Sequence, residues 1–545
     1  ERLRREAIAR IDQRVQDVRF EQSLIAERRR GGLPSQTVDS DAASRFGGIR
    51  PDQFYSLNSR GGRQLLRGTI SRWRIQARLL RFTPTTFSGD RVAFTNDPFT
   101  PAQSWVDSTD VVATLMPNGD TVIKARRNRL RLEDRLSLAV TRQATIKKEQ
   151  VDNRLVIGYD LTDRDGYYVG YNIPVALTSK LQLTLQPQFL AERAVNSQTD
   201  VYPLPGQSAA ASPVAQPATT ADLFGLEARL EGPVWGFDAD LRLDMSTFNA
   251  ENIPDGTRSW GTLERNLRLP LLGESTFKLF GAYRYQIWNG SLGQQDVYSA
   301  YGASLEQTAD LPTWGRLTSD YYWRIGVGNY QNNPVDSVVL DRLWRGTAIG
   351  SLNASLPLWS GRPAPATPLA GLMNTAVPVV PGLSLDANLL GTLAYYGDGT
   401  NQNTITLSGG PTLTLGHFIK PFLDYTRFTI TGSGTLRQGV SPFGFDRAVD
   451  LGTLGIGLTQ QIVGPLVFNG GIGFNVSPSS SYYGDVTASY IELRWQRRAY
   501  EIGVFFSPYQ GIGGLRFKLN DFNFNGPGVP FVPLNPAAAR LSRPF

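Results

Sequence analysis

The sequence has 545 residues, no cysteine and a single histidine, His417. Without cysteine the chain can form neither a disulfide nor a thiolate metal site. One histidine also argues against a histidine-rich metal centre and a histidine-based catalytic triad. We therefore expect no catalytic residue, no metal and no cofactor. We expect His417 to have a structural role, because it lies in a Leu-Gly-His-Phe turn.

Long hydrophobic runs are also missing. No run of about 18 apolar residues occurs, which excludes a membrane-spanning helix. A transmembrane β-strand is not detected in this way, because every second residue can be polar. The net charge of +7 would suit anionic lipid headgroups or nucleic acid. We expect no nucleic-acid partner, because neither a clustered basic surface nor a nucleic-acid-binding module is recognisable.

What the chain does contain is alternation of apolar and polar residues. In Phe237–Met245, Leu241 and Leu243 fall on one side of an extended strand, and Arg242 and Asp244 fall on the other. The same alternation returns in residues 277–287, 491–496 and 515–519. A period of two indicates strands with one apolar and one polar face. The apolar side is rich in Gly, Tyr, Phe and Leu, which is typical of a barrel with lipid outside and water inside.

We count 18 alternating segments between residues 154 and 519. An even number is expected of bacterial single-chain barrels, and we place the true number within roughly 16–26. Long connections alternate with short turns, so all the long ones should lie at one end. The long connections are residues 194–221, 249–257, 289–295, 332–338, 432–447 and 478–484. Residues 358–381 break the rule, and indicate either a miscount or a periplasmic or plug-like insertion.

Aromatic residues lie near the ends of the predicted strands. The residues in this position are Trp235, Trp288, Trp359, Tyr395 and Tyr396. They suit the girdles that membrane proteins place at the membrane–water interface.

The prediction is an all-β fold in which a large antiparallel transmembrane β-barrel follows a smaller β-domain and a short N-terminal helix. The parts are an amphipathic helix at 1–34, a linker at 35–65, a small all-β unit at 66–150, the barrel at 151–520 and a Pro-rich tail at 521–545. Because the sequence begins at Glu1 without a leader, we expect a targeting signal to have been removed from a longer precursor. A terminal aromatic such as Phe545 is typical of outer-membrane barrels.

Three segments of the small β-unit carry a family resemblance. Residues 73–78 (Trp-Arg-Ile-Gln-Ala-Arg), 87–103 and 124–135 resemble the periplasmic OstA-type jelly roll of the LptD family, and most of all its cyanobacterial-type branch. The most specific part is the run Asn96-Asp-Pro-Phe. The resemblance covers most of the chain after residue 65, in the barrel by pattern alone. This chain departs from the family in having no cysteine, since many members join the two domains by disulfides, and in having a shorter barrel than the best-known members.

The resemblance implies an outer-membrane translocon, with its N-terminal domain in the periplasm. Lipopolysaccharide or a related glycolipid would enter a groove in the jelly roll. It would leave through a lateral gate between the first and last barrel strands into the outer leaflet. The implied partners are the glycolipid, periplasmic jelly-roll bridge proteins of the same transport system, the outer membrane and, as an open possibility, a plug lipoprotein.

The groove and the gate can each be assigned candidate residues. The groove candidates are the alternating apolar positions Ile75, Val92, Phe94, Val112, Ile123, Leu130 and Leu132, which plain core packing would also explain. The gate candidates lie in the first and last strands or are prolines that remove a ladder donor near them: Leu155, Ile157, Tyr159, Pro174, Pro187, Leu515 and Phe517.

Two other functions remain open. A passive porin would not need an N-terminal jelly roll with an apolar interior. A structural outer-membrane protein would need neither that groove nor weakened strands at the seam. A lateral gate would therefore separate the translocon from both alternatives.

Overall fold

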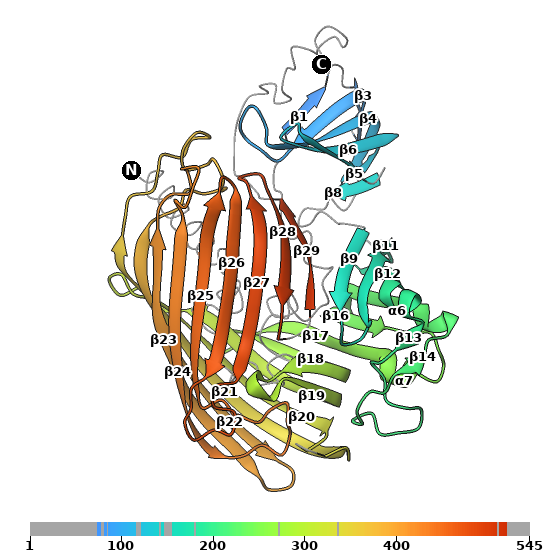
Figure 1. Cartoon of the computed structure of the whole chain (residues 1–545), viewed down its shortest axis with the longest axis vertical. Coiled ribbons are helices and arrows are strands. Elements are labelled where there is room, and N and C mark those ends of the chain that lie inside the picture. The colour runs from blue at the N-terminus through green and yellow to red at the C-terminus, as the bar shows by residue number, and fades with distance from the viewer. Residues whose placement is uncertain are drawn as a thin grey trace.

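The computed structural model describes residues 74–77, 81–83, 85–115, 121–140, 143–146, 155–178, 181–270, 273–334, 337–509 and 512–519. The predicted N-terminal helix, the linker and the C-terminal tail lie outside these residues. Most of the described chain is antiparallel β-strand, arranged in a smaller N-terminal sheet and a large sheet (Figure 1). The prediction of an all-β fold is confirmed.

The N-terminal sheet has eight strands. They are β1 (Arg74–Ala77), β2 (Arg81–Phe82), β3 (Thr86–Thr95), β4 (Ser104–Leu115), β5 (Thr121–Lys124), β6 (Arg127–Leu132), β7 (Leu136–Val140) and β8 (Gln143–Ile146). The long strand β4 pairs with β6 over its first half and with β5 over its last four residues, so the sheet branches there.

The large sheet runs from β9 to β29. Its strands are β9 (Leu155–Asp160), β10 (Gly166–Tyr171), β11 (Ile173–Ala176), β12 (Gln182–Leu190), β15 (Phe224–Val234), β16 (Phe237–Met245), β17 (Thr257–Leu269), β18 (Gly273–Trp288), β19 (Gln294–Asp310), β20 (Thr318–Asn332), β21 (Asp341–Ser360), β22 (Gly382–Tyr396), β23 (Asn401–Leu415), β24 (Thr426–Gly439), β25 (Gly452–Val463), β26 (Leu466–Asn475), β27 (Val486–Gln496), β28 (Tyr500–Ser507) and β29 (Ile512–Leu519).

Successive strands of the large sheet pair with each other, and β29 pairs in turn with β9. Figure 1 shows the sheet curving round, with β17–β20 behind β25–β28. β10 and β11 are separated by Asn172 alone and both pair with β12. Taken together as one strand, they reduce the 19 named elements to 18 strands, the number of alternating segments counted in the sequence.

The two faces of the large sheet are inverted relative to a water-soluble sandwich. On β20, Arg324 is 1% exposed, whereas the next residue, Ile325, is 60% exposed. On β27, Glu492 and Arg494 are buried, and Leu493 between them is exposed. We call the side with buried polar residues the inner face and the side with exposed apolar residues the outer face. The alternation predicted for 491–496 has this orientation.

Two aromatic assignments are wrong. The sequence places Tyr285 on the outer face with Tyr283, but Tyr285 is buried in an aromatic cluster on the inner face. Arg284 between them has a positive φ of 48° and is skipped in the pairing with β19, which shifts the alternation by one residue. Tyr396 was expected in an interface girdle, but it is buried, whereas its neighbour Tyr395 is exposed.

Most of the long connections lie at one end of the large sheet. We call the end at which β9 begins the near end and the opposite end the far end. The far end carries α6 (Ala191–Asn196), the ribbon of β13 (Gln198–Thr199) and β14 (Gln216–Pro217), η2 (Thr220–Leu223), α7 (Ile253–Gly256) and η3 (Gly290–Leu292). The connections predicted to be long lie at this end. The far-end connection 440–451 starts later than expected, because β24 runs on to Gly439.

The exceptional segment 361–381 lies at the near end, between β21 and β22. Gln103, directly before β4 of the N-terminal sheet, donates a hydrogen bond from Nε2 to the carbonyl of Met373, 3.0 Å away, and Ala376 packs against the cluster that contains Leu130 and Leu132 of β6. His417 accompanies this segment, with its Nε2 3.0 Å from the carbonyl oxygen of Arg362. The insertion therefore packs against the N-terminal sheet, and His417 makes a structural contact as expected.

Among the described residues, no helix is long and apolar enough to cross a membrane. Nor do the described His, Asp and Glu side chains form a group of three or more that could hold a metal ion.

Candidate functional site

The N-terminal sheet encloses an apolar cluster that contains three of the predicted groove residues. Val92, Phe94 and Ile123 are buried there. Val111, Ala113 and Ala125 complete the cluster, with Ala77 and Phe87 packed against it. The rings of Phe87 and Phe94 lie 6.4 Å apart between centroids. These residues form an apolar interior drawn mainly from β3, β4 and β5.

The other four groove predictions are placed elsewhere. Val112 is 46% exposed and points away from the cluster, because Asp110 takes a positive φ of 51° and shifts the buried side of β4 to the odd-numbered Val111 and Ala113. Ile75 is exposed at the sheet edge. Leu130 and Leu132 are buried against Ala499 and Tyr500 of the large sheet. Those two leucines therefore belong to the junction between the sheets and not to the cluster.

The seam between the first and last strands is short. β29 pairs with β9 through three residue pairs, Ile512 with Asp160, Gly513 with Tyr159 and Gly514 with Gly158. All three lie toward the far end. The same register continued toward the near end would bring Leu515 opposite Ile157 and Phe517 opposite Leu155, but the described pairing stops before these positions. By contrast, β20 and β21 pair over 15 residues.

The predicted gate residues flank this seam. Side chains are described for only two of them, Tyr159 and Pro187; for Leu155, Ile157, Pro174, Leu515 and Phe517 only the strand positions are described. The ring of Tyr159 lies 4.7 Å from that of Tyr167 on β10 and 6.5 Å from that of Phe506 on β28. Tyr159 thus makes ring contacts on both sides of the seam.

The two prolines lie in the strands next to the seam. Pro174 is opposite Thr184 in the pairing of β11 with β12, two residues after the interruption at Asn172. Pro187 is opposite Leu226 in the pairing of β12 with β15. Neither can donate a ladder hydrogen bond. β9 pairs with β10 as far as Tyr171, so β11 continues past the start of β9.

The paired part of the seam adjoins a buried polar network at the far end. Arg164, in the turn after β9, is completely buried and donates hydrogen bonds to Asp160, Gln188 and Asp244, each at 2.8 Å. Its guanidinium also lies over the ring of Tyr168, 4.8 Å from the centroid. Because Asp160 is opposite Ile512 of β29, this network connects the seam to β12 and β16.

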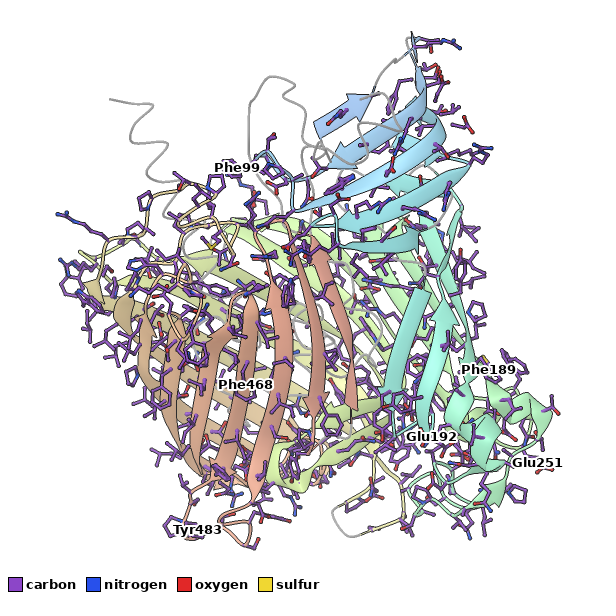
Figure 2. The ribbon with its side chains drawn as sticks, turned by 45° about the horizontal axis from the view of Figure 1, so that its top comes forward. Phe99, Phe189, Glu192, Glu251, Phe468 and Tyr483 are labelled. Carbon is purple, nitrogen blue, oxygen red and sulfur yellow. The ribbon has the colours of Figure 1, made fainter. Side chains whose placement is uncertain are left out.

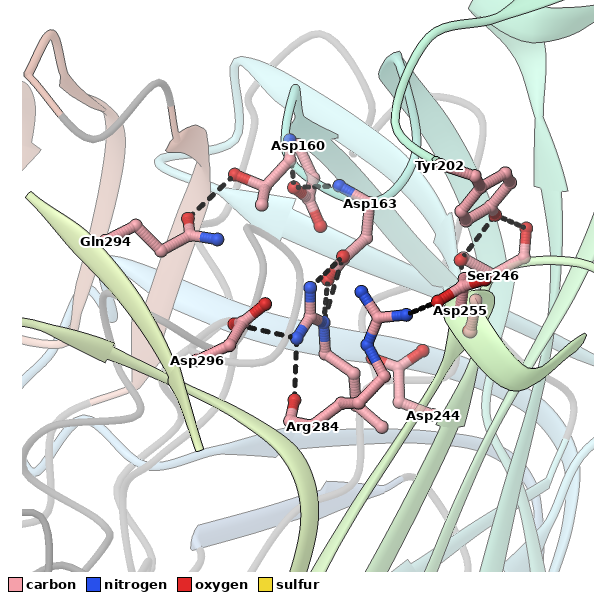
Figure 3. Close-up of polar contacts among 12 residues, drawn as sticks. Asp160, Asp163, Tyr202, Asp244, Ser246, Asp255, Arg284, Gln294 and Asp296 are labelled. Atoms are coloured by element: carbon pink, nitrogen blue, oxygen red, sulfur yellow. Dashed lines mark hydrogen bonds and ion pairs between the residues drawn. The ribbon is translucent and has the colours of Figure 1, made fainter. Parts of the chain in front are cut away.

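A second arginine connects the same turn to strands farther along the sheet. Arg258 of β17 donates to Asp163 at 2.9 Å and 3.0 Å and to Asp296 of β19 at 3.1 Å (Figure 3). Thr162 of the turn donates to Gln294, also of β19, at 3.4 Å. The first strands are therefore joined by charged side chains on the inner face.

The far-end segment 440–451 folds against the inner face. Phe443 and Phe445 are completely buried and stack with ring centroids 5.1 Å apart. Phe445 lies 5.8 Å from Tyr330 of β20, and Phe443 lies 5.8 Å from Tyr396 of β22. Since the segment connects β24 to β25, these contacts are made across the space that the large sheet surrounds.

Polar contacts fasten the same segment. Asp446 accepts two hydrogen bonds from Arg345 of β21, at 2.7 Å and 2.8 Å, and both side chains are buried. Asp450 accepts hydrogen bonds from the amide of Ser291 at 3.0 Å and from Asn475 at 2.5 Å. Burial raises the pKa of Asp450, an effect that the hydrogen bonds from Ser291 and Asn475 only partly offset.

Comparison with known families covers most of this chain. A family described as "Protein of unknown function (DUF3769)" matches residues 67–523, which include every strand of both sheets. The chain belongs to this family. No curated protein matches the sequence.

Sequence reasoning missed two parts of the site in this DUF3769 protein. The first part is the connection between β3 and β4, which stood out in the sequence only as the unusual run 96–99. Its residues Asn96 and Asp97 contact Ala499 and Arg498, about four hundred residues away. The sequence predicts residues 432–447 only as a long connection and does not place the segment 440–451 against the inner face. A signal was present in Phe443, Phe445 and Asp446, because two phenylalanines in a solvated loop are unusual.

Proposed function

We propose that this DUF3769 protein is an outer-membrane translocon that receives lipopolysaccharide or a related glycolipid in its N-terminal sheet and releases it sideways into the outer leaflet. In this proposal the large sheet is a transmembrane β-barrel, the N-terminal sheet is a periplasmic jelly roll, and the near end faces the periplasm. The observation that carries the proposal is the inversion of the two faces of the large sheet.

The inverted faces support a membrane location for a physical reason. A water-soluble protein seldom exposes a contiguous apolar patch larger than a few hundred Å². Here apolar side chains are exposed along the outer face of strand after strand, among them Leu279, Ile325, Leu393, Leu407 and Leu493. Many charged side chains on the inner face form ion pairs, as in the contact of Lys278 with Glu306 at 2.5 Å. A lipid bilayer around the large sheet would contact the apolar side chains of the outer face, and a polar interior would contact the charged side chains of the inner face.

Lateral release is supported by the shape of the seam. Three residue pairs close it at the far end, and the pairing stops toward the near end, where the N-terminal sheet lies. A backbone hydrogen bond contributes about 0.5–1.5 kcal/mol net in water, so a short ladder is cheaper to open than a full one. Unpaired backbone groups cost more in lipid, so a partly zipped seam suits intermittent opening.

The apolar cluster around Phe94 supports a lipid cargo. A passive porin needs no second sheet with such an interior and gains nothing from a shortened seam. The segment 440–451 also occupies part of the space inside the large sheet, which a passive pore would leave open. The remaining partners we propose are periplasmic jelly-roll proteins that deliver the glycolipid to the N-terminal sheet.

Stapling the seam tests the proposal. Because Leu515 falls opposite Ile157 in the continued register, the pair Ile157→Cys and Leu515→Cys should form a disulfide when the seam closes fully, in a chain without native cysteine. We expect the oxidised variant to stop delivering newly made glycolipid to the cell surface, and a reductant to restore delivery. The matched control is Ile405→Cys with Leu436→Cys, two exposed partners on β23 and β24 far from the seam.

The outcome that contradicts the proposal is clear. Undiminished glycolipid delivery through a fully oxidised seam, in a barrel that still shows heat-modifiable migration, would exclude lateral release. The passive-porin alternative would then be preferred. Loss of delivery in both disulfide variants would also count against the gate, because the effect would not be specific to the seam.

A further inference from the structure

The run Asn96–Phe99, the most unusual motif of the N-terminal sheet, lies at the junction of the two sheets. It begins the connection between β3 and β4 and meets residues 497–499, the near-end turn between β27 and β28. In Figure 2, Phe99 lies between the N-terminal sheet and the near end of the large sheet. Asn96 and Asp97 are almost fully buried, although they belong to a loop.

An ion pair forms the centre of this junction. Both carboxylate oxygens of Asp97 accept from Nε of Arg498 at 3.0 Å, and Nη2 of Arg498 completes the salt bridge at 3.0 Å. The same carboxylate accepts the backbone amides of Phe99 and Gln103, at 3.0 Å and 2.8 Å. Asp97 therefore shapes its own loop and receives Arg498 in that shape.

The other contacts constrain the direction of approach. Asn96 donates to the carbonyl of Ala499 at 2.8 Å. Arg498 donates to the carbonyl of Pro101 at 3.1 Å, and its guanidinium lies over the ring of Phe99, 5.3 Å from the centroid. A planar guanidinium held at its edge and on its face can take one orientation only.

The neighbouring residues widen the junction. Arg497 donates to Glu133 at the end of β6 and to Asn374 of the near-end insertion, both at 2.9 Å. Leu130 and Leu132 pack against Ala499 and Tyr500. The turn is thus held by charged, polar and apolar contacts from three parts of the chain.

We propose that Asn96–Phe99 and Arg497–Ala499 form a clasp that fixes the N-terminal sheet to the last strands of the large sheet, with Asp97 and Arg498 as its positioning residues. β28 pairs with β29, the strand on one side of the seam. The clasp therefore sets the position of the apolar cluster relative to the open part of the seam. The clasp itself does not depend on the proposed function. Only its purpose, the alignment of the apolar cluster with the seam, rests on that function.

The clasp also makes the two sheets mechanically coupled. A movement of the N-terminal sheet, such as the docking of a delivery protein, is transmitted to β27–β29 through the buried ion pair. The first strands are joined separately, through Arg164 and Arg258 on the inner face. The seam thus lies between a part that follows the N-terminal sheet and a part anchored at the far end.

The test measures orientation directly. Because the chain has no cysteine, Leu136→Cys on β7 and Trp314→Cys in a near-end turn, both exposed positions, can carry two spin labels alone. In the full-length protein in bilayers, we expect one narrow distance distribution by pulsed electron resonance. Arg498→Met removes the charge and should broaden it severalfold, and Asn96→Ala should broaden it less. The control is Lys420→Ala in another near-end turn, whose side chain is 75% exposed.

Two readouts separate this inference from the proposed function. A narrow, unchanged distribution in Arg498→Met, with heat-modifiable migration retained, refutes the clasp whether or not glycolipid is transported. If the distribution broadens, photo-crosslinking at Phe94 and at Tyr159 shows its consequence. We expect glycolipid capture to persist at Phe94 and to fall severalfold at Tyr159. Broadening with no glycolipid at Phe94 even in the unaltered protein would leave the clasp standing and would overturn the proposed function.

Discussion

The substitution Asp446→Asn should open the interior of the large sheet. Asp446 and Arg345 are 3% and 0% exposed in their side chains, and two hydrogen bonds join them at 2.7 Å and 2.8 Å. The hydroxyl of Tyr396 donates to the same carboxylate. Asparagine keeps the shape of the side chain but removes its charge, so Arg345 remains as a buried cation without its counter-charge.

The magnitude follows from the burial of this pair. Removing one partner of a buried ion pair costs about 3–5 kcal/mol. Since about 1.4 kcal/mol changes an equilibrium tenfold, the ratio of released to docked segment should rise by roughly a hundredfold to a few thousandfold. The strands of the large sheet need not separate for this, because residues 440–451 are a connection between β24 and β25. The cost therefore falls on the docking of the segment and not on the whole fold.

Single-channel conductance in planar bilayers measures the release. We expect the unaltered protein to show rare, brief openings and Asp446→Asn to show frequent or lasting ones. Asp398→Asn is the control, because Asp398 is also at the far end but caps only its own exposed turn through Thr400. Equal conductance in Asp446→Asn and the unaltered protein, with heat-modifiable migration retained in both, would refute the view that this segment closes the interior.

Two further predictions concern the N-terminal sheet and the near end of the large sheet. Photo-crosslinkers at Phe94 and Ile123 should capture glycolipid in cells, and one at the outward-facing Val112 should not; equal capture at all three would remove the cluster as the cargo site. Burial of Asp424, in the turn before β24, raises its pKa, but the backbone amides of Ile419 and Lys420 outweigh this and lower the pKa below its ordinary value. Asp424 therefore stabilises the turn above about pH 4, and this contribution is lost as pH falls through the lowered pKa. Amide protection factors at Ile419 and Lys420 should fall there in the unaltered protein but stay level in Asp424→Asn; the same acid-induced fall in both would contradict the assignment.

Much of the strand pattern was predictable, because it depends on local chemistry. Residues 491–496 alternate in the sequence and alternate in burial, since successive side chains of a strand point to opposite faces. The prediction failed where one residue leaves strand geometry. Asp110 and Arg284 take positive φ values, and after each of them the buried side changes. Neither residue is a glycine, the residue type for which a positive φ is common, so the sequence did not indicate the change.

The candidate site was predictable only in part. That Val92, Phe94 and Ile123 share one apolar cluster could be predicted, because apolar residues of neighbouring strands tend to share a core. Leu130 and Leu132 have the same local pattern but are buried against Tyr500, hundreds of residues later in the chain. The local sequence does not distinguish a residue of the apolar cluster from a residue buried against the large sheet. Assigning Leu130 and Leu132 to the junction therefore required the arrangement of the two sheets. The same holds for Asp97, whose partner Arg498 looks like any other turn residue.

By itself, the sequence determined the all-β class, the approximate number of strands and which connections are long, because period-two alternation and turn residues are visible in short stretches of neighbouring residues. Only the tertiary structure decided how few residues close the seam between β29 and β9, that Phe443 and Phe445 turn inward, and that Asp97 receives Arg498. Each of these depends on contacts between residues far apart in the chain. Such contacts are selected by the packing and charge pairing of the whole fold, which no short stretch of sequence specifies.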